Sequence, residues 1–271
     1  MASSASSDRS NPVALVTGAS SGIGEALAPC FAAAGHDLVL VARSADKLQV
    51  LARQLADDHG IKAWVEPADL AQPGAAARLV ATLRRKRRRI DVLVNNAGVL
   101  VQGPFVGMKR GEAGRMIDLN ISGLTALLDE LLPAMVARGS GRVLNVASIA
   151  AFQPVPTLAT YAATKAYVLS LTESLAEELR GTGVTITALC PGITATPMLG
   201  QAASANARLS ELPAFLVGDV HDVARQGFEA CMRGDVICVP GVVNRAAMVA
   251  SRGTPKWLVR RIGGWIGRQA L

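Results

Sequence analysis

The sequence predicts an α/β fold: one doubly wound domain in which a seven-stranded parallel sheet is flanked by helices on both faces. Short apolar runs rich in Val, Leu and Ile alternate with helical patterns along the chain. The runs are continuously apolar rather than alternating, which is typical of parallel strands covered on both faces. Half of the 271 residues are hydrophobic, so the chain can bury one large core, and no linker divides it.

Seven apolar runs are the expected strands, and the helical segments between them provide the right-handed crossovers that parallel strands require. The runs lie at 13–17, 37–42, 62–66, 90–95, 141–146, 185–189 and 235–239. In such folds the carboxyl ends of the strands form the ligand-binding edge of the sheet.

The first strand leads into a glycine-rich turn and then into a helical pattern that begins near Ile23. The turn has the sequence Gly18-Ala-Ser-Ser-Gly22-Ile-Gly24. Glycines at such a turn let backbone N–H groups and a helix N-terminus approach a pyrophosphate. The spacing departs from the usual Gly-x-Gly-x-x-Gly pattern, so the turn alone leaves a flexible loop as an alternative.

Ser148, Tyr161 and Lys165 supply a hydroxyl, a phenol and an amine at informative spacings. Tyr161 and Lys165 are four residues apart and therefore share one face of a helix. A phenol with an ordinary pKa of about 10 works as an acid or base near neutrality only if a nearby cation stabilises its phenolate. Lys165 is placed to do so, although a surface tyrosine beside a solvated lysine has the same spacing. Ser148 follows a buried strand, where a helix-capping role is the alternative.

Together these segments resemble the short-chain dehydrogenase/reductase (SDR) family over about residues 12 to 241. Five ordered motifs carry the resemblance: the cofactor turn at 17–24, the adenine-side pair Asp69-Leu70, the motif Asn95-Asn96-Ala97-Gly98, the tetrad Asn120, Ser148, Tyr161 and Lys165, and the nicotinamide-side loop Pro191-Gly192-Ile-Thr194-Ala-Thr196. The family's fold is a single NAD(P)-binding Rossmann domain, and we expect that fold here.

The resemblance implies hydride transfer between a nicotinamide and the carbon of a ketone or secondary alcohol. It assigns Tyr161 as proton donor, Ser148 as hydrogen-bond donor to the substrate oxygen, and Lys165 as the group that lowers the phenol's pKa and holds the nicotinamide ribose. Asn120 would anchor a water molecule that links Lys165 to solvent. The implied cofactor contacts are Gly18, Ser20, Ser21, Gly22, Ile23, Gly24, Arg43, Ser44, Asp69, Leu70, Asn96, Ala97, Gly98, Tyr161, Lys165, Pro191, Gly192, Thr194 and Thr196.

Some of these residues have a simpler alternative role. Asp69 could cap the helix that follows it, and Thr194 and Thr196 could bond locally as turn residues. The end of the second strand, Ala42-Arg43-Ser44, indicates the preferred cofactor. A carboxylate at Ala42 would bind the 2′-hydroxyl of NAD, whereas a guanidinium at Arg43 suits a 2′-phosphate. NADP(H) is therefore the expected cofactor, with NAD(H) as the alternative.

The net charge of +7 does not indicate a nucleic-acid partner. Six positive charges lie in the run 84–89 and six in 242–271, so the rest of the chain is net acidic. The run at 84–89 ends a predicted helix, where solvated cations complement the helix dipole. The four cysteines have no metal-ligand spacing, so we expect free thiols, a reducing cytoplasm and no metal.

Beyond the catalytic domain at 12–241 we expect a disordered polar head at 1–11 and a basic, apolar tail at 242–271. The tail would pack on the domain or a second subunit, or make weak contact with a membrane surface. No uninterrupted apolar stretch predicts a spanning helix. A lid at about 197–218 would cover a fairly apolar substrate. Assembly as a homodimer or homotetramer is expected.

Three functions remain open on the sequence alone. An NADPH-dependent carbonyl reductase acting reversibly on a ketone or secondary alcohol is favoured by the complete tetrad. A 3-oxoacyl thioester reductase is the alternative within the enzyme class, and a non-catalytic NADP-binding regulatory protein is the alternative outside it.

Overall fold

The sheet of the computed structural model has seven parallel strands in the order β3-β2-β1-β4-β5-β6-β7. They are β1 (Val13–Thr17), β2 (Asp37–Val41), β3 (Ala63–Val65), β4 (Val92–Asn95), β5 (Gly141–Val146), β6 (Val184–Leu189) and β7 (Ile237–Cys238). The predicted fold class is confirmed. All seven predicted strands are present, and their ends differ from the predicted ones by at most two residues.

The structure describes residues 11–200, 217–242, 244–246 and 248. The predicted head, most of the predicted lid and nearly all of the predicted tail therefore lie outside the described residues. Of the lid, its two ends at 197–200 and 217–218 are described.

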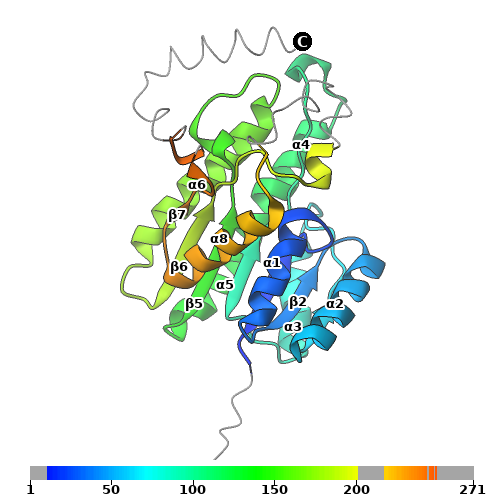
Figure 1. The fold of residues 1–271 in the computed structure, drawn as a ribbon, viewed down its shortest axis with the longest axis vertical. Helices are drawn as coiled ribbons and strands as arrows, with labels where there is room; N and C mark the ends of the chain where they lie inside the picture. Colours follow the sequence, from blue (N-terminus) through cyan, green and yellow to red (C-terminus); the bar gives the residue numbers. More distant parts are fainter. Residues whose placement is uncertain (1–10, 201–216, 243, 247, 249–271) are drawn as a thin grey trace, which may run out of the picture.

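Two layers of helices cover the sheet, one on each face (Figure 1). One layer contains α1 (Gly22–Ala33), α2 (Ala45–His59) and α8 (Val220–Arg233), and the other contains α3 (Ala75–Arg85), α5 (Leu124–Ala137) and α6 (Ala159–Glu178). In Figure 1, α1 and α8 lie in front of the sheet. The strands bury side chains on both faces: Leu15 of β1 belongs to one apolar cluster and Val16 to the other. This arrangement explains why the strand sequences are continuously apolar.

Two shorter elements, α4 (Glu112–Ile117) and the π-helical turn η2 (Asp118–Gly123), precede α5 and make the helix continuous from Glu112 to Ala137. Among the described residues, this run alone is long and apolar enough by composition to cross a membrane, although the sequence predicts no spanning helix. Leu124, Leu127 and Met135 join the apolar cluster beneath the sheet. We therefore interpret the run as a core helix of the domain.

The arginine-rich run at 84–89 was predicted to be a solvated helix end, but two of its residues make specific contacts. Lys86 and Arg88 both pair with the carboxylate of Glu66, which is buried after β3, and the Lys86 nitrogen lies 2.6 Å from it. Arg88 also lies over the ring of Trp64, 4.4 Å from the ring centre. A buried carboxylate needs such partners because desolvation penalises its charge. These contacts fasten the end of α3 to β3 and to the loop that leads to Asp69.

Gly123 provides a test of how closely η2 approaches the rest of the domain. A methyl group added at Gly123 would lie 2.5 Å from the Leu70 carbonyl oxygen, a backbone atom that cannot swing away. Gly123→Ala should therefore lower the free energy of unfolding in urea by about 1–3 kcal/mol. Gly114→Ala in α4 is the matched control, because no atom lies within 4 Å of the added methyl group. That control should be neutral or stabilising by up to about 1 kcal/mol. Equal effects of the two substitutions would contradict this account of the contact.

Candidate active site

The predicted site residues gather at the carboxyl ends of β1, β4, β5 and β6. The glycine turn follows β1, the segment 96–98 follows β4, Ser148 follows β5 and the loop 191–196 follows β6. The strand order reverses direction between β1 and β4, and doubly wound sheets bind their ligands at this crevice. The topology therefore brings together motifs that are far apart in the sequence.

The glycine turn is held by the segment after β4. The Asn96 side chain donates to the carbonyl oxygen of Thr17 at 2.9 Å, and the Thr17 hydroxyl accepts the backbone N–H groups of Asn96 and Ala97 at 2.9 and 3.0 Å. A methyl group at Gly18 would lie 2.7 Å from the Asn96 amide nitrogen and 2.9 Å from the Ala97 Cα. Gly18 also has a left-handed φ of 65°. Only glycine satisfies both conditions.

The start of α1 has the features of a dinucleotide-phosphate site. Ser21 precedes the helix but makes no side-chain cap, so the first N–H groups of α1 have no capping side chain. Gly22 has a φ of 61°, and a methyl group there would lie 3.3 Å from the Thr196 side chain. The turn and the loop after β6 thus face each other across a gap that a side chain at Gly22 would fill. These residues fit the pyrophosphate of a dinucleotide. Ser20 and Ile23 lie in the same turn.

The end of β2 lies next to the glycine turn. The Ala19 N–H group donates to the Val41 carbonyl oxygen at 3.3 Å, so Arg43 and Ser44 follow only two and three residues after a direct contact with the turn. Both side chains are exposed, and Ser44 precedes α2 without capping it. Within the described part of the chain, Arg43 pairs with no carboxylate, so its guanidinium is available to an anion.

α3 begins at Ala75 with Gly74 as its N-cap, so Asp69 does not cap that helix and its bonds are local. Its carboxylate accepts the Ala71 N–H group at 3.2 Å and lies 3.5 Å from the Gln72 side chain. Leu70 is buried beside it, against η2. An adenine contact by this pair stays a prediction.

Tyr161 and Lys165 lie one turn apart on α6, as their spacing predicts. The Lys165 ammonium group lies 5.7 Å from the centre of the Tyr161 ring and donates to the Val146 carbonyl oxygen at 2.8 Å. The Ser148 side chain hydrogen-bonds to Tyr161, and its hydroxyl oxygen also accepts the Ala150 N–H group at 3.1 Å. The structure therefore brings the predicted serine, tyrosine and lysine together, and Ser148 caps the next segment as well.

The pKa values differ from the expectation in one respect. Burial raises the pKa of the Tyr161 phenol, and the hydrogen bond from Ser148 lowers it in part. Burial also lowers the pKa of Lys165 to about 8, with Cys190 opposing that change. The expected lowering of the phenol's pKa by Lys165 is not seen in this structure. The ammonium group donates instead to the Val146 carbonyl oxygen.

Asn120 lies in η2 and is buried, and its side-chain amide makes three hydrogen bonds. Its side chain exchanges two hydrogen bonds with the backbone of Val99, at 2.9 and 3.0 Å, and donates a third to the Thr164 hydroxyl at 3.1 Å. A methyl group at Gly98 would lie 3.2 Å from the Asn120 oxygen and 3.6 Å from the Lys165 nitrogen. Asn120 thus fastens the segment after β4 to α6. Its predicted role in a water relay is not tested by these contacts.

The loop after β6 makes mostly local hydrogen bonds. The Thr194 hydroxyl donates to the Gly192 carbonyl oxygen at 3.0 Å, and the Thr196 hydroxyl donates to the Thr194 carbonyl oxygen at 3.3 Å. The Pro191 carbonyl oxygen accepts the Ile149 N–H group at 2.9 Å, which ties this loop to the segment that begins at Ser148. Both threonines therefore act as turn residues here, and their contacts to a nicotinamide stay predictions.

Sequence reasoning missed two supporting residues. Thr17 carries the hydroxyl that holds the segment after β4, and Thr164 binds Asn120 and the Tyr161 carbonyl oxygen. The position of Thr164, next to Lys165 and three residues after Tyr161, was a usable signal. The partner of Thr17 lies almost eighty residues away, so no local pattern could identify it.

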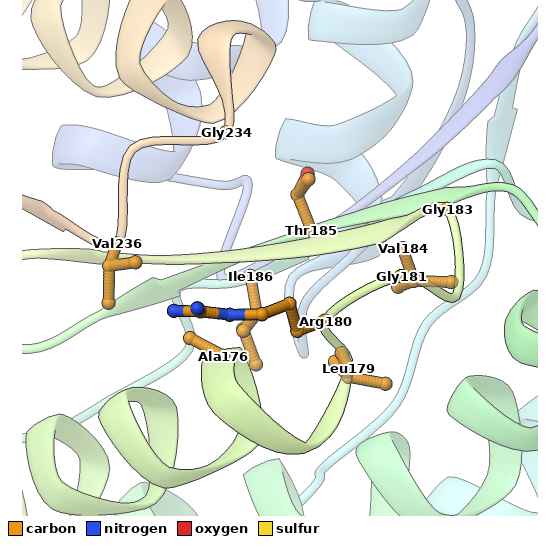
Figure 2. Close-up of a pocket in the computed structure, with 10 residues that line it drawn as sticks. All are labelled: Ala176, Leu179, Arg180, Gly181, Gly183, Val184, Thr185, Ile186, Gly234 and Val236. Carbon is orange, nitrogen blue, oxygen red and sulfur yellow. The ribbon is translucent and has the colours of Figure 1, made fainter.

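A separate cavity of about 290 Å³ lies at the opposite edge of the sheet (Figure 2). It is lined by Ala176, Leu179, Arg180, Gly181, Gly183, Val184, Thr185, Ile186, Gly234 and Val236. Figure 2 shows the Arg180 side chain lying along it toward Val236. None of the predicted site residues lines this cavity, so we do not interpret it as the substrate site.

Comparisons with known proteins agree with this geometry. A family model described as short chain dehydrogenase matches residues 12–207. Oxidoreductase UcpA of Escherichia coli is 38% identical over 186 residues, which is 68% of this chain and 70% of that protein. Among solved structures, a short-chain dehydrogenase from Sphingobium yanoikuyae in complex with NADPH has a TM-score of 0.78 at 35% identity and covers 89% of this chain and 93% of its own.

A second solved structure, the bulky-bulky ketone specific alcohol dehydrogenase from Comamonas testosteroni, has a TM-score of 0.74 at 31% identity, covering 90% of this chain and 95% of its own. The family model matches well over half of the chain, and the two solved structures share its fold over about nine tenths of it. The chain therefore belongs to the short-chain dehydrogenase/reductase family.

Proposed function

We propose that this protein is an NADP(H)-dependent oxidoreductase that interconverts a ketone and a secondary alcohol on a fairly apolar substrate. The observation that carries the proposal is the grouping of Ser148, Tyr161 and Lys165 beside the glycine turn, at the carboxyl edge of the sheet. The nicotinamide, when bound, supplies or accepts the hydride. The residues of the chain then hold the substrate oxygen and exchange its proton.

Tyr161 is the proton donor in the direction of ketone reduction. Its raised pKa keeps the phenol protonated at neutral pH, so the proton is available when negative charge develops on the substrate oxygen. The Ser148 hydroxyl, whose single hydrogen is directed to Tyr161 in this structure, would turn to donate to the same oxygen and stabilise that charge. Asn120 and Thr164 hold α6 in register with the segment after β4, which keeps the phenol in place.

Lys165 is the cation of the site. Its ammonium group lies beside Gly98 and Tyr161. It does not lower the phenol's pKa in this structure, and we assign it to the phenolate that forms only after proton donation. We assign the ribose of the nicotinamide nucleotide to the same ammonium group. Arg43 and Ser44, together with the N-terminus of α2, are assigned to a 2′-phosphate. The NADPH bound by the Sphingobium yanoikuyae relative supports this choice, and NAD(H) stays the alternative cofactor.

The substrate assignment rests on the predicted lid at 197–218, which is rich in Met, Leu and Phe. The bulky ketones named for the Comamonas testosteroni relative support an apolar carbonyl compound. A 3-oxoacyl thioester is the alternative substrate class, and a non-catalytic regulatory protein is the alternative function. The four cysteines are free, as in a reducing compartment, and we place the enzyme in the cytoplasm.

Assembly into a homodimer or homotetramer is part of the proposal. On the outer sides of α5 and α6, Val136 and Tyr167 are exposed, and the Tyr167 hydroxyl bonds to Thr125. A second subunit on these helices would cover that surface. Light scattering that gives the mass of a single chain would contradict the assembly.

The proton-donor assignment can be tested with Tyr161→Phe, using a ketone found by screening carbonyl compounds for oxidation of NADPH. Loss of the phenol should reduce kcat by about 10²–10⁴-fold. The affinity for NADPH should change by less than about threefold, because the ring and Lys165 remain. Tyr167→Phe on the same helix is the control and should keep full activity. A Tyr161→Phe enzyme with most of its activity would refute the assignment, and a wild-type protein that binds NADPH but reduces no ketone would favour the regulatory function.

The cation assignment predicts a pH-dependent gain in stability for Lys165→Met. Since burial lowers the pKa of Lys165 from 10.5 to about 8, the buried charge destabilises the folded protein at pH 7. The variant should be inactive, but its free energy of unfolding at pH 7 should be about 1–2 kcal/mol higher than that of the wild type. This value allows for the lost bond to the Val146 carbonyl oxygen. The gain should shrink as the pH rises from about 8 to 10.5, because the folded wild type then loses the buried proton and its charge while the unfolded chain still keeps its own. Denaturant unfolding at several pH values measures this difference in the free energy of unfolding. A variant less stable than the wild type at pH 7 would contradict the prediction.

The cofactor assignment predicts a specific loss in Arg43→Ala. Without the guanidinium, kcat/KM for NADPH should fall by about 10–100-fold, whereas the value for NADH should change little. Arg53→Ala removes an exposed positive charge from α2 and serves as the control. Equal losses with both cofactors would assign Arg43 to the fold rather than to the 2′-phosphate.

A further inference from the structure

After β7 the chain forms a turn from which the Asn244 side chain reaches the loop 191–196. Two side-chain bonds fix this turn: the Asn244 amide donates to the Pro240 carbonyl oxygen at 2.8 Å, and the Arg245 guanidinium donates to the Val239 carbonyl oxygen at 2.9 Å. The Arg245 N–H group also donates to the Gly241 carbonyl oxygen at 3.1 Å, which closes a helical turn. The first residues beyond the predicted domain end at 241 are therefore anchored to the segment that follows β7.

The Asn244 side chain lies directly against Gly192. A methyl group added at Gly192 would lie 2.5 Å from both the nitrogen and the oxygen of the Asn244 amide, and 2.7 Å from the carbon between them. The flat face of the amide therefore covers the Gly192 Cα. Gly192 does not have a left-handed φ, so its backbone conformation would accept other residues. Close approach of Asn244 is the reason for glycine at this position.

Gly192 lies in the loop 191–196, which contacts both the segment that begins at Ser148 and the end of the predicted lid. Pro191 before it accepts the Ile149 N–H group next to Ser148, and the Gly192 carbonyl oxygen accepts the Thr194 hydroxyl. Thr194 pairs in turn with Gly218, the last residue of the predicted lid. A shift of the Gly192 backbone would therefore displace the Ser148 segment, the loop and the end of the lid together.

We infer that Asn244 is a positioning residue for the nicotinamide side of the cofactor cleft, and that the Gly192–Asn244 contact couples the C-terminal segment to cofactor affinity. The inference rests on the proposed NADP(H) function and adds a residue that acts through Gly192 without touching the reacting atoms. Nothing local in the sequence indicates Asn244, which lies fifty-two positions after Gly192.

A double-mutant cycle tests the inference with Asn244→Ala, Gly192→Ala and the double variant, using Val242→Ala as the control. Val242 lies in the same turn and is 82% exposed. Two readouts are measured: the dissociation constant for NADPH by fluorescence titration and the melting temperature without cofactor. NADPH binding by the wild type is measured first, and its absence would refute the proposed cofactor rather than the contact.

Asn244→Ala should weaken NADPH binding by about threefold to tenfold and leave its melting temperature close to that of Val242→Ala. Gly192→Ala should weaken binding by more than about tenfold and lower the melting temperature, because its methyl group meets the Asn244 amide. The double variant should bind NADPH more tightly and melt higher than Gly192→Ala, since removing the amide makes room for the methyl group.

Additive losses in the double variant, or unchanged NADPH affinity in Asn244→Ala, would overturn the inference. If Gly192→Ala does not fold, the double variant decides the matter by itself. A folded double variant supports the contact, and an unfolded one refutes it. The melting temperatures keep this result independent of the cofactor.

Discussion

The site depends on one buried charge, the Lys165 ammonium group, which is held at the carboxyl end of β5. The Val146 carbonyl oxygen that receives it is the last of that strand, and burial there lowers the lysine's pKa to about 8. Such a group is retained against its cost in stability. The neighbouring residues hold the ammonium group in place. Gly98 leaves the space beside it, and Asn120 bonds to Thr164 of α6 and to the segment after β4.

A second set of buried polar side chains fixes the same helix from below. Asn95 of β4 donates to Asn145 of β5 at 3.0 Å, and Asn145 donates to the Thr172 hydroxyl of α6 at 2.9 Å. Because Asn145 and Thr172 are fully buried, sliding α6 by one residue would break the bond between them and leave both groups unpaired, at a cost of about 1–3 kcal/mol each. This bond thus helps to fix the register of α6, and with it the positions of Tyr161 and Lys165.

Local patterns in the sequence predicted the strands, the glycine turn and the shared helix face of Tyr161 and Lys165, because strand and helix periodicity depend on neighbouring residues. Contacts between distant segments were not predictable in this way. Most of the arginine run is exposed, as predicted, but Lys86 and Arg88 pair with Glu66, and that pairing depends on how β3 meets α3. The direction of the Tyr161 pKa shift also depends on burial, which spacing does not reveal.

The two pKa shifts move the groups of the site apart. The ordinary pKa values of a tyrosine and a lysine are similar, but burial raises the pKa of the Tyr161 phenol and lowers that of the Lys165 ammonium group to about 8. The buried phenol therefore keeps its proton until a substrate oxygen takes it, whereas the buried ammonium group carries a charge that desolvation penalises. A phenolate formed by proton donation would lie beside that ammonium group, and each charge would offset part of the desolvation cost of the other. The pairing of the two groups therefore contributes most in the state that follows proton transfer.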